Sequence, residues 1–378
     1  MPVKDRRPTH AEINLKHLTY NLNQIKERVG ADIKILAVVK ADAYGHGAYT
    51  ISSCLEKCGI DFLGVAYLEE AVELKKAGIK TPILILGGIF PGQEPYIAEY
   101  DLVPVIFDST IARNLSRCAL EKNKKISVHV KIDTGMGRLG IVNSQVKIFL
   151  ENIKTLPNIT ISGILSHLAV AESDLSPDLS FTKKQIDNLK QAAEEFSNMG
   201  FNPLWKHIAN SALIINYRLS YFNLVRPGLM LYGASPSLNL FNKFPLLPVM
   251  NIKTKVMQLK EVPAGATISY GRTYTCRKKT KIAILPIGYA DGFPRNLSNK
   301  GEVLIKGKRA KVVGAVCMDM TMIDVTKIPR IKTGDDVVII GKQEGEQITV
   351  EELAKKAETI PYEIFCRIGN RVPRVYID

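Results

Sequence analysis

The sequence predicts an α/β fold with two parts: a (β/α)8 TIM-type barrel over residues 1–243 and a mainly β domain over residues 244–378. Three observations support this prediction. The chain has 378 residues, which is too long for one ordinary core. Between about residues 34 and 232, a short apolar run, a turn and a helical pattern alternate eight times. After residue 243 the pattern changes to short strands and turns.

The eight apolar runs of the first part are the expected barrel strands. They are residues 34–40, 62–67, 82–88, 102–107, 126–133, 159–167, 204–209 and 224–232. The segments between them have helical spacing, and one of them ends at Gly78, a residue type that favours helix termination. Eight such units favour a barrel of about 250 residues over an open doubly wound sheet. No GxGxxG follows the first run, which weakens a dinucleotide-binding interpretation.

The second part is expected to be mostly strands, with one helix that begins after Thr349 and ends near Thr359. The expected strands are residues 252–259, 266–269, 281–286, 302–305, 310–313 and 336–340. Polar and aromatic residues gather at four turns, which contain Tyr270, Tyr289, Met318 and Tyr362. Four such turns in one domain indicate a surface that faces a site.

Composition limits the function classes. A hydrophobic content of 46% and a charged content of 23% are typical of a soluble globular protein. No apolar run approaches the roughly 18 residues that a membrane span needs, and no secretory signal is seen, so we expect a cytoplasmic protein without a membrane partner. Six scattered cysteines without a CxxC pair favour free thiols and predict neither a disulfide framework nor a metal site.

The formal net charge of +14 raises the question of nucleic-acid binding. The basic clusters are short, lie at turns and lack interleaved aromatic residues. We therefore expect no nucleic-acid partner, and attribute the charge to solvated faces and to attraction for small anionic ligands.

Lys40 is the most informative single residue. It ends a run of buried, β-branched residues, and Gly45, His46 and Gly47 follow it closely. Burial disfavours an ammonium ion, so a lysine delivered by such a strand suits imine formation or general-base catalysis. The alternative is a lysine that extends from the strand end into solvent.

Other polar residues lie at the ends of the later runs, where catalytic residues of barrels gather. Lys131 closes the fifth run and Arg138 follows it, while His167 closes the sixth. The seventh and eighth runs supply further candidates, which are Asn210, Ser211, Arg226 and Gly228. Barrels often bind phosphate with the loops after these two strands, although Asn210 and Ser211 are equally suited to capping a helix.

Eight segments together resemble one known family. They are VVKADAYGHG, KIDTGMGRLG, ANSA, VRPGLMLYG, ISYGRTY, IGYADGFPR, VCMDM and IPYEIFCRIGNRVPR. In order and spacing they resemble the alanine racemases over essentially the whole chain. The resemblance implies an isomerase that interconverts L- and D-alanine with pyridoxal 5′-phosphate and supplies D-alanine for peptidoglycan. It also implies a homodimer with active sites at the interface.

The resemblance further implies roles for individual residues. Lys40 would bind the cofactor covalently and act as the base on the D side, and Tyr270 of the other subunit as the base on the L side. His167 would lower the pKa of that tyrosine, and Arg226 would contact the pyridine nitrogen. The remaining cofactor contacts would come from Tyr44, Asn210, Ser211, Gly228, Leu229 and Tyr362.

Substrate contacts are implied in the same way. Arg138 and the backbone N–H of Met318 would bind the substrate carboxylate, and Tyr289 and Tyr362 would narrow the entrance. Lys131 resembles a lysine that can be carbamylated.

Three alternatives remain open. They are a racemase for a larger or polar amino acid, a pyridoxal-dependent barrel decarboxylase, which would lack the ISYG tyrosine, and a single-domain protein that only carries the cofactor.

Overall fold

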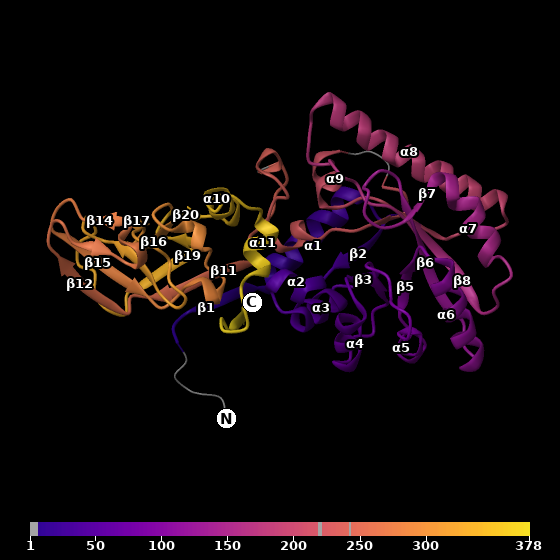
Figure 1. Ribbon diagram of the computed structural model, residues 1–378, viewed down its shortest axis with the longest axis horizontal. Helices are drawn as coiled ribbons and strands as arrows, with labels where there is room; N and C mark the ends of the chain where they lie inside the picture. The colour runs from indigo at the N-terminus through magenta and orange to yellow at the C-terminus, as the bar shows by residue number, and fades with distance from the viewer. Residues whose placement is uncertain (1–6, 218–220, 242) are drawn as a thin grey trace.

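The computed structural model describes residues 7–217, 221–241 and 243–378. It has two lobes, and Figure 1 shows a sheet-rich lobe on the left and a lobe of strands surrounded by helices on the right. The helices α2 (Lys40–Gly45) and α11 (Pro361–Cys366) lie between them. No helix in this described part of the chain is long and apolar enough to cross a membrane.

The right-hand lobe is a nearly closed barrel of eight parallel strands. They are β2 (Lys34–Val38), β3 (Phe62–Val65), β4 (Ile83–Ile85), β5 (Val103–Ile106), β6 (Ile126–Asp133), β8 (Ile159–Leu165), β9 (Trp205–His207) and β10 (Leu224–Val225). The strand order is β10-β2-β3-β4-β5-β6-β8-β9, and a parallel bridge between Asn210 and Arg226 links the segments after β9 and β10. A short strand, β7 (Ile141–Val142), pairs with β6. The predicted barrel is thus confirmed.

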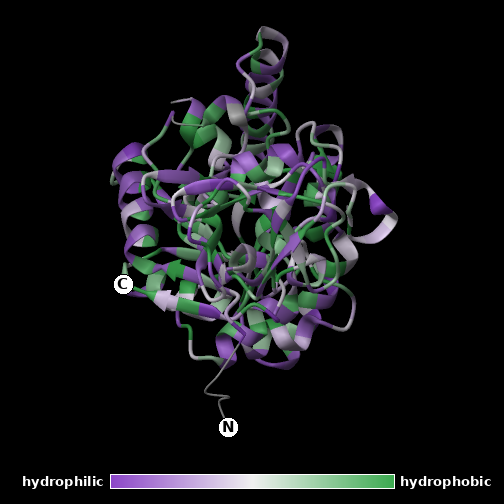
Figure 2. Ribbon diagram, turned by 90° about the vertical axis from the view of Figure 1, so that its left-hand side faces the viewer, coloured by the Kyte–Doolittle hydropathy of each residue, from purple (hydrophilic) through white to green (hydrophobic). Residues whose placement is uncertain are grey.

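Helices cover the outside of this barrel, and each follows or precedes a strand. They are α1 (Leu15–Val29), α3 (Ala48–Lys57), α4 (Leu68–Lys76), α5 (Glu94–Glu99), α6 (Ser109–Glu121), α7 (Val146–Ile153), α8 (Ser176–Asn198) and α9 (Ser211–Asn216). In α8 the buried residues recur every three or four positions, as expected of a helix with one buried face. Figure 2 shows hydrophilic and hydrophobic residues alternating along such surface helices.

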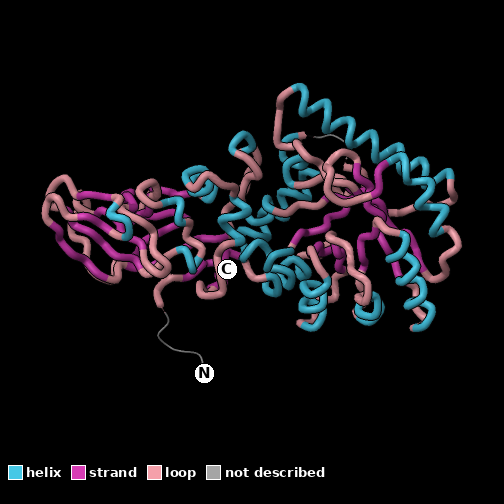
Figure 3. Tube along the Cα trace, viewed as in Figure 1, coloured by secondary structure: helices cyan, strands magenta, loops and turns pink. Residues whose placement is uncertain are grey.

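The left-hand lobe contains a mostly antiparallel sheet. Its main order is β12-β15-β18-β17-β16-β19-β11-β1-β21. These strands are β12 (Gln258–Val262), β15 (Thr280–Leu285), β18 (Thr321–Asp324), β17 (Lys308–Val312), β16 (Glu302–Ile305), β19 (Asp336–Gln343), β11 (Met250–Lys255), β1 (His10–Asn14) and β21 (Arg374–Ile377). Figure 3 shows strands dominating this lobe. The predicted mainly β character is confirmed.

Smaller elements complete this lobe. The strand β20 (Glu346–Ile348) pairs with β19, and β13 (Thr267–Ile268) pairs with β14 (Tyr274–Thr275). The helix α10 (Val350–Lys356) begins at the predicted N-cap, Thr349, whose side chain accepts the N–H of Glu352. It ends at Lys356, earlier than predicted, and the separate helix α11 begins at Pro361.

The structure differs from the sequence analysis in three details. The run 252–259 belongs to two strands, since β11 pairs with β1 and β19 while β12 pairs with β15. The run 224–232 is a strand only at its start, and the 3-10 helix η2 (Leu229–Tyr232) follows Pro227 and Gly228. Residues 10–14, predicted to belong to the barrel part, form β1 in the second sheet.

Candidate active site

A cavity of about 540 Å³ lies at the carboxyl ends of the barrel strands. Eighteen residues line it. They include nine predicted site residues, which are Lys40, Tyr44, Lys131, Arg138, His167, Asn210, Ser211, Arg226 and Gly228, and a tenth, Tyr362, which comes from α11. The structure therefore brings together residues that the sequence spreads over more than 300 positions.

Lys40 lies just after β2, at the edge of this cavity. Burial, together with the positive charge of Arg138, lowers the pKa of the Lys40 ammonium group below its ordinary value. A lowered pKa increases the fraction of neutral amine at a given pH, and only the neutral amine is nucleophilic or basic.

The turn after Lys40 has an uncommon backbone. Four successive residues, Ala41 to Tyr44, have φ values between 52° and 54°, in the left-handed region. Each such residue costs about 1–2 kcal/mol when it is not glycine. The turn directs the Tyr44 ring inward, where its centroid lies 5.0 Å from that of Tyr232 and 5.8 Å from that of Tyr362.

Arg226 follows β10 and is only 5% exposed. Its Nη2 donates to the carbonyl oxygen of Ser166 over 2.6 Å and lies 3.2 Å from His167 Nδ1, while its Nη1 lies 2.9 Å from His207 Nδ1. Burial and Arg138 lower the pKa of Arg226 to about 10, so the guanidinium remains charged at neutral pH.

The histidines around Arg226 are neutral. Burial first, and then the charge of Arg226, lowers the pKa of His167 and His207 well below the ordinary value and that of His129 to about 3. Because a guanidinium can only donate, both His167 and His207 must accept at Nδ1 and carry their proton on Nε2. His207 then donates to His129 Nδ1 over 2.8 Å, whereas the Nε2–H of His167 is left to donate to another group.

Part of the cavity wall is a cradle of small polar groups from the segments after β9 and β10. Ser211 Oγ accepts the backbone N–H of Gly228 over 2.9 Å and that of Met230 over 3.4 Å, so its own hydroxyl proton can be donated to a ligand. A Cβ at Gly228 would lie 2.5 Å from the hydroxyl oxygen of Tyr44, which explains why glycine is needed there. Asn210 caps α9 by accepting the N–H of Leu213, and Leu229 is buried at the start of η2.

Lys131 and Arg138 form a positively charged side of the cavity. Lys131 is 6% exposed, and burial, with Arg226 and Arg138, lowers its pKa to about 8. Among the residues that the structure describes, neither side chain has an ion pair with a carboxylate. This side of the cavity suits an anion, such as a substrate carboxylate or phenolic oxygen.

Three predicted site residues lie elsewhere, on the sheet-rich lobe. Tyr270, in the 3-10 helix η4 (Tyr270–Arg272), is 72% exposed, and it lines two surface hollows, one with Tyr289 and one with Met318. None of the three lines the cavity of Lys40. Figure 1 places β14, which follows Tyr270, at the far end of this lobe. One copy of the chain therefore does not bring these three residues to Lys40.

The turns of Tyr289 and Met318 are bound to each other. The N–H of Tyr289 donates to the carbonyl of Cys317 over 3.0 Å, and the N–H of Ala290 donates to that of Met318 over 3.1 Å. Buried Asp291 supports the first turn by accepting the N–H of Gly288 over 3.0 Å.

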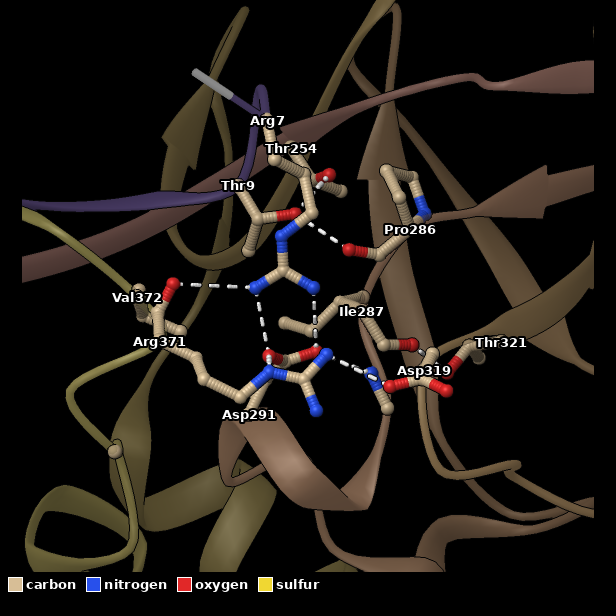
Figure 4. Close-up of polar contacts among 12 residues, drawn as sticks. Arg7, Thr9, Thr254, Pro286, Ile287, Asp291, Asp319, Thr321, Arg371 and Val372 are labelled. Atoms are coloured by element: carbon tan, nitrogen blue, oxygen red, sulfur yellow. Dashed lines mark hydrogen bonds and ion pairs between the residues drawn. The ribbon is translucent and has the colours of Figure 1, made fainter. Parts of the chain in front are cut away.

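Two arginines hold these turns from the side. Arg7 donates to both oxygens of Asp291, over 2.6 and 3.0 Å, and Arg371 Nη2 donates to Asp319 over 2.7 Å. Figure 4 shows Arg7 and Arg371 on two sides of Asp291. The backbone N–H of Met318 is therefore held on a supported turn.

Sequence reasoning missed several residues. The cavity lining also includes Val38, Ala66, Tyr67, Leu86, Gly87, Leu139, Leu165 and Ile360. Ala66 and Leu86 directly follow β3 and β4, so the rule that barrel sites lie at strand ends could have found them. His129 and His207 were also missed, although a histidine inside an apolar strand run is a visible signal. Among the described residues there is no group of three or more histidine, cysteine, aspartate or glutamate side chains that could hold a metal.

Comparisons with known proteins agree with this arrangement. Residues 13–236 match the model described as "Alanine racemase, N-terminal domain", and residues 249–376 match "Alanine racemase, C-terminal domain". The alanine racemase of Halothermothrix orenii is 46% identical over 370 residues, 98% of this chain and 97% of the relative. That of Citrifermentans bemidjiense is 46% identical over 378 residues, 99% of this chain and 100% of the relative.

Solved structures give the same result. The alanine racemase of Clostridium difficile 630 has a TM-score of 0.92 at 39% identity, covering 99% of this chain and 96% of that one. The alanine racemase from Bartonella henselae, described with covalently bound pyridoxal phosphate, has a TM-score of 0.88 at 31% identity, covering 98% of this chain and 99% of that one.

Proposed function

Because this chain belongs to the alanine racemase family, we propose that Lys40 and Tyr270 are the two bases of an enzyme that interconverts L- and D-alanine. The protein is an isomerase, and the usual role of the family is to supply D-alanine for peptidoglycan. The single observation that carries the residue assignment is that Lys40, Arg226 and the cradle of Ser211 and Gly228 line one cavity.

The cofactor that we propose is pyridoxal 5′-phosphate, and the residues of the cavity fit it. The neutral fraction of Lys40 can form a covalent bond to an aldehyde, and the Ser211 hydroxyl and the close approach at Gly228 suit a phosphate. The other proposed cofactor contacts are Tyr44, Asn210, Leu229 and Tyr362. When bound, this cofactor withdraws electrons from the amino acid and makes its Cα proton acidic.

Arg226 would determine whether the reaction leads to racemisation or to transamination. Its guanidinium would hydrogen-bond the pyridine nitrogen without releasing its proton, since its lowered pKa of about 10 is still above neutral pH. The adjacent His207 accepts from Arg226 and is neutral, so it supplies no proton to that nitrogen either. With Arg226 in this place, electron withdrawal by the bound cofactor would stay modest, which would favour return of the proton to Cα over transamination.

Racemisation requires a base on each face of Cα, and we assign the D side to Lys40 and the L side to Tyr270. A tyrosine with an ordinary pKa near 10 is a weak base at neutral pH and needs a hydrogen-bond donor beside its oxygen. His167 suits this role, because Arg226 occupies its Nδ1 and leaves its Nε2–H as the donor.

A homodimer is part of this proposal. Tyr270 is exposed and lies outside the cavity of its own chain, so we propose that it enters the cavity of a second copy. Tyr289 and Met318 would enter with it, since their turns are hydrogen-bonded together. Met318 would offer its N–H to the substrate carboxylate, and Tyr289 with Tyr362 would narrow the entrance to favour a methyl side chain.

Arg138 would bind the same carboxylate and the phenolic oxygen of the cofactor. Lys131 would orient Arg138 after carbamylation, which turns its amine into an anion. A pKa of about 8 leaves a fraction of Lys131 as neutral amine, the form that reacts with carbon dioxide.

We further propose that the chain consists of two domains with different roles, divided near residue 243. The barrel residues before it supply all the proposed cofactor contacts except Tyr362, while residues 244–378, joined by strand β1, carry the second base. We place the enzyme in the cytoplasm.

Borohydride reduction of the purified holoenzyme tests the proposal, since it would fix the cofactor on its lysine. We expect loss of the visible absorbance and a labelled peptide that contains Lys40. Lys40→Ala should abolish both the absorbance and the racemisation of alanine. Label on another lysine would disprove the assignment. Faster turnover of L-serine or L-lysine than of L-alanine would contradict the proposed entrance.

A further inference from the structure

The left-handed turn after Lys40 needs support from outside, because no glycine occupies its first four positions. Ala41, Asp42, Ala43 and Tyr44 all have φ near 53°. Residues in such a conformation persist only where surrounding contacts hold them. Two supports are local: Glu70 accepts the N–H of Ala41 over 2.5 Å, and Asp42 accepts the N–H of Ala48 over 2.7 Å.

A third support comes from the last strand of the chain. Arg374, the first residue of β21, donates through Nε to the carbonyl of Gly45 over 2.9 Å. Its other nitrogens donate to three carbonyls of the segment that joins α11 to β21, those of Ile368, Gly369 and Val372, over 2.5 to 2.7 Å. The guanidinium thus ties the end of the turn to the C-terminal segment.

The C-terminal segment also packs closely against Gly45 and Gly47, the two glycines that follow the turn. A Cβ at Gly45 would lie 2.4 Å from the carbonyl oxygen of Phe365, and one at Gly47 would lie 1.9 Å from the hydroxyl of Tyr376. Figure 1 shows α11 beside α2, with the C-terminus next to them. The C-terminal segment therefore contacts the turn on both sides of His46.

We propose that Arg374 is a positioning residue, which holds the turn in its left-handed form so that Lys40 and Tyr44 face the cavity before the cofactor arrives. The inference rests on the proposed role of Lys40. Only a planar group with several fixed N–H donors can bind four carbonyls in this way, and a lysine cannot replace it. Arg374 does not line the cavity of Lys40, and it would act through the backbone of Gly45.

Two substitutions and their combination test this role. Arg374→Lys keeps the charge but loses most of the carbonyl contacts. Ala41→Gly removes the backbone strain at an exposed position and keeps the N–H that Glu70 accepts. Arg113→Lys is the matched control, because Arg113 is exposed on α6 and its side chain donates hydrogen bonds only to the nearby Ser109 and Thr110 among the described residues.

Titration of each apoprotein with pyridoxal 5′-phosphate, followed by visible absorbance, gives the dissociation constant. We expect Arg374→Lys to weaken binding about tenfold, equal to about 1.4 kcal/mol. The Arg113→Lys control should bind as the parent does. Adding Ala41→Gly to Arg374→Lys should recover at least half of the loss on a logarithmic scale. If Arg374 only stabilised the fold as a whole, adding Ala41→Gly would not restore the cofactor affinity of Arg374→Lys.

Amide hydrogen exchange of the apoproteins gives a second reading that does not depend on the cofactor. Arg374→Lys should speed exchange in residues 41–47 more than in the barrel strands. Parental affinity and exchange in Arg374→Lys, or a loss that Ala41→Gly leaves in full, would overturn the inference. If Arg374→Lys does not fold, Ala41→Gly alone decides: tighter cofactor binding supports the strained turn, and weaker binding overturns it. Borohydride labelling of another lysine would instead refute the proposed function, whatever these variants show.

Discussion

Arg226 donates through Nη1 to Nδ1 of His207 over 2.9 Å, and this bond fixes the protonation of a chain of buried groups. His207 must carry its proton on Nε2, where it donates to His129 over 2.8 Å. The three side chains are each no more than 5% exposed, and Arg226 alone is charged. The cavity is therefore lined by a cation, Arg226, and its neutral neighbours accept hydrogen bonds from it. They have no extra proton to transfer through Arg226 to a group in the cavity.

Replacing Arg226 by glutamate should change what the enzyme makes as well as how fast. An acid at this position can share a proton with the pyridine nitrogen, which strengthens electron withdrawal and lengthens the time before Cα is reprotonated. We expect the kcat for racemisation to fall about 100-fold, the scale seen when one charge-stabilising donor is lost. Pyruvate formed per racemisation event should rise. Equal pyruvate partitioning in Arg226→Glu and the parent would show that the account of Arg226 is wrong.

Carbamylation of Lys131, as proposed, should make activity depend on carbon dioxide. Its pKa of about 8 leaves neutral amine available, and a carbamate there would be the anion that Arg138 lacks. In buffer freed of carbon dioxide we expect the KM for alanine to rise about tenfold, the effect of losing one charge-assisted contact worth about 1.5 kcal/mol. Bicarbonate should restore it. Lys131→Gln should have the raised KM at all bicarbonate concentrations, and a bicarbonate response in this variant would contradict the role of Lys131.

His46 should make the folded protein sensitive to acid. Burial lowers the pKa of His46 to about 3, against about 6.5 in an unfolded chain. Below about pH 6.5 the unfolded state therefore binds a proton that the folded state does not, so the free energy of unfolding falls as the pH falls. The loss is about 1.4 kcal/mol per pH unit for this histidine, down to its folded pKa.

Urea unfolding at several pH values between about 4.5 and 6.5 measures this loss. His46→Asn should be less stable at neutral pH, because it loses ring contacts with Tyr232 and Phe365. Its free energy of unfolding should nevertheless fall less steeply with acid than that of the parent. Equal slopes would mean that His46 is not a neutral buried group.

Local patterns in the sequence predicted the barrel well, because each buried parallel strand is a continuous apolar run between helices. The strands β1 and β21 were not found, although β1 alternates intermediate and buried residues. The two strands pair with each other across the ends of the chain, in the registers Ala11 to Arg374 and Ile13 to Tyr376, and β1 also pairs with the distant strand β11. Such pairing over more than 300 positions leaves no local signal.

The residues of the candidate site were predictable where they lie at strand ends or within the eight segments that resemble a known family. The residues that support it were not, since support depends on three-dimensional contacts. Arg226 bonds to His207, and Arg374 bonds to Gly45. In each pair the two residues are separated along the sequence and meet only after the chain has folded. The left-handed turn at Ala41 to Tyr44 was also missed, because alanine and tyrosine ordinarily disfavour that conformation.

In the proposed enzyme, Lys40 of one copy and Tyr270 of another act on the same alanine. Each of the variants Lys40→Ala and Tyr270→Phe should be inactive alone, since each removes one base. In a mixed dimer, one of the two sites would combine the intact Lys40 of one chain with the intact Tyr270 of the other.

Co-expression of the two variants with different affinity tags, followed by purification through both tags, tests the claim directly. The mixed dimer should regain about half of the parental kcat, because one of its two symmetric sites is complete. A mixed dimer that is verified by mass and carries bound cofactor, yet remains as inactive as either variant alone, would contradict a site shared between two copies.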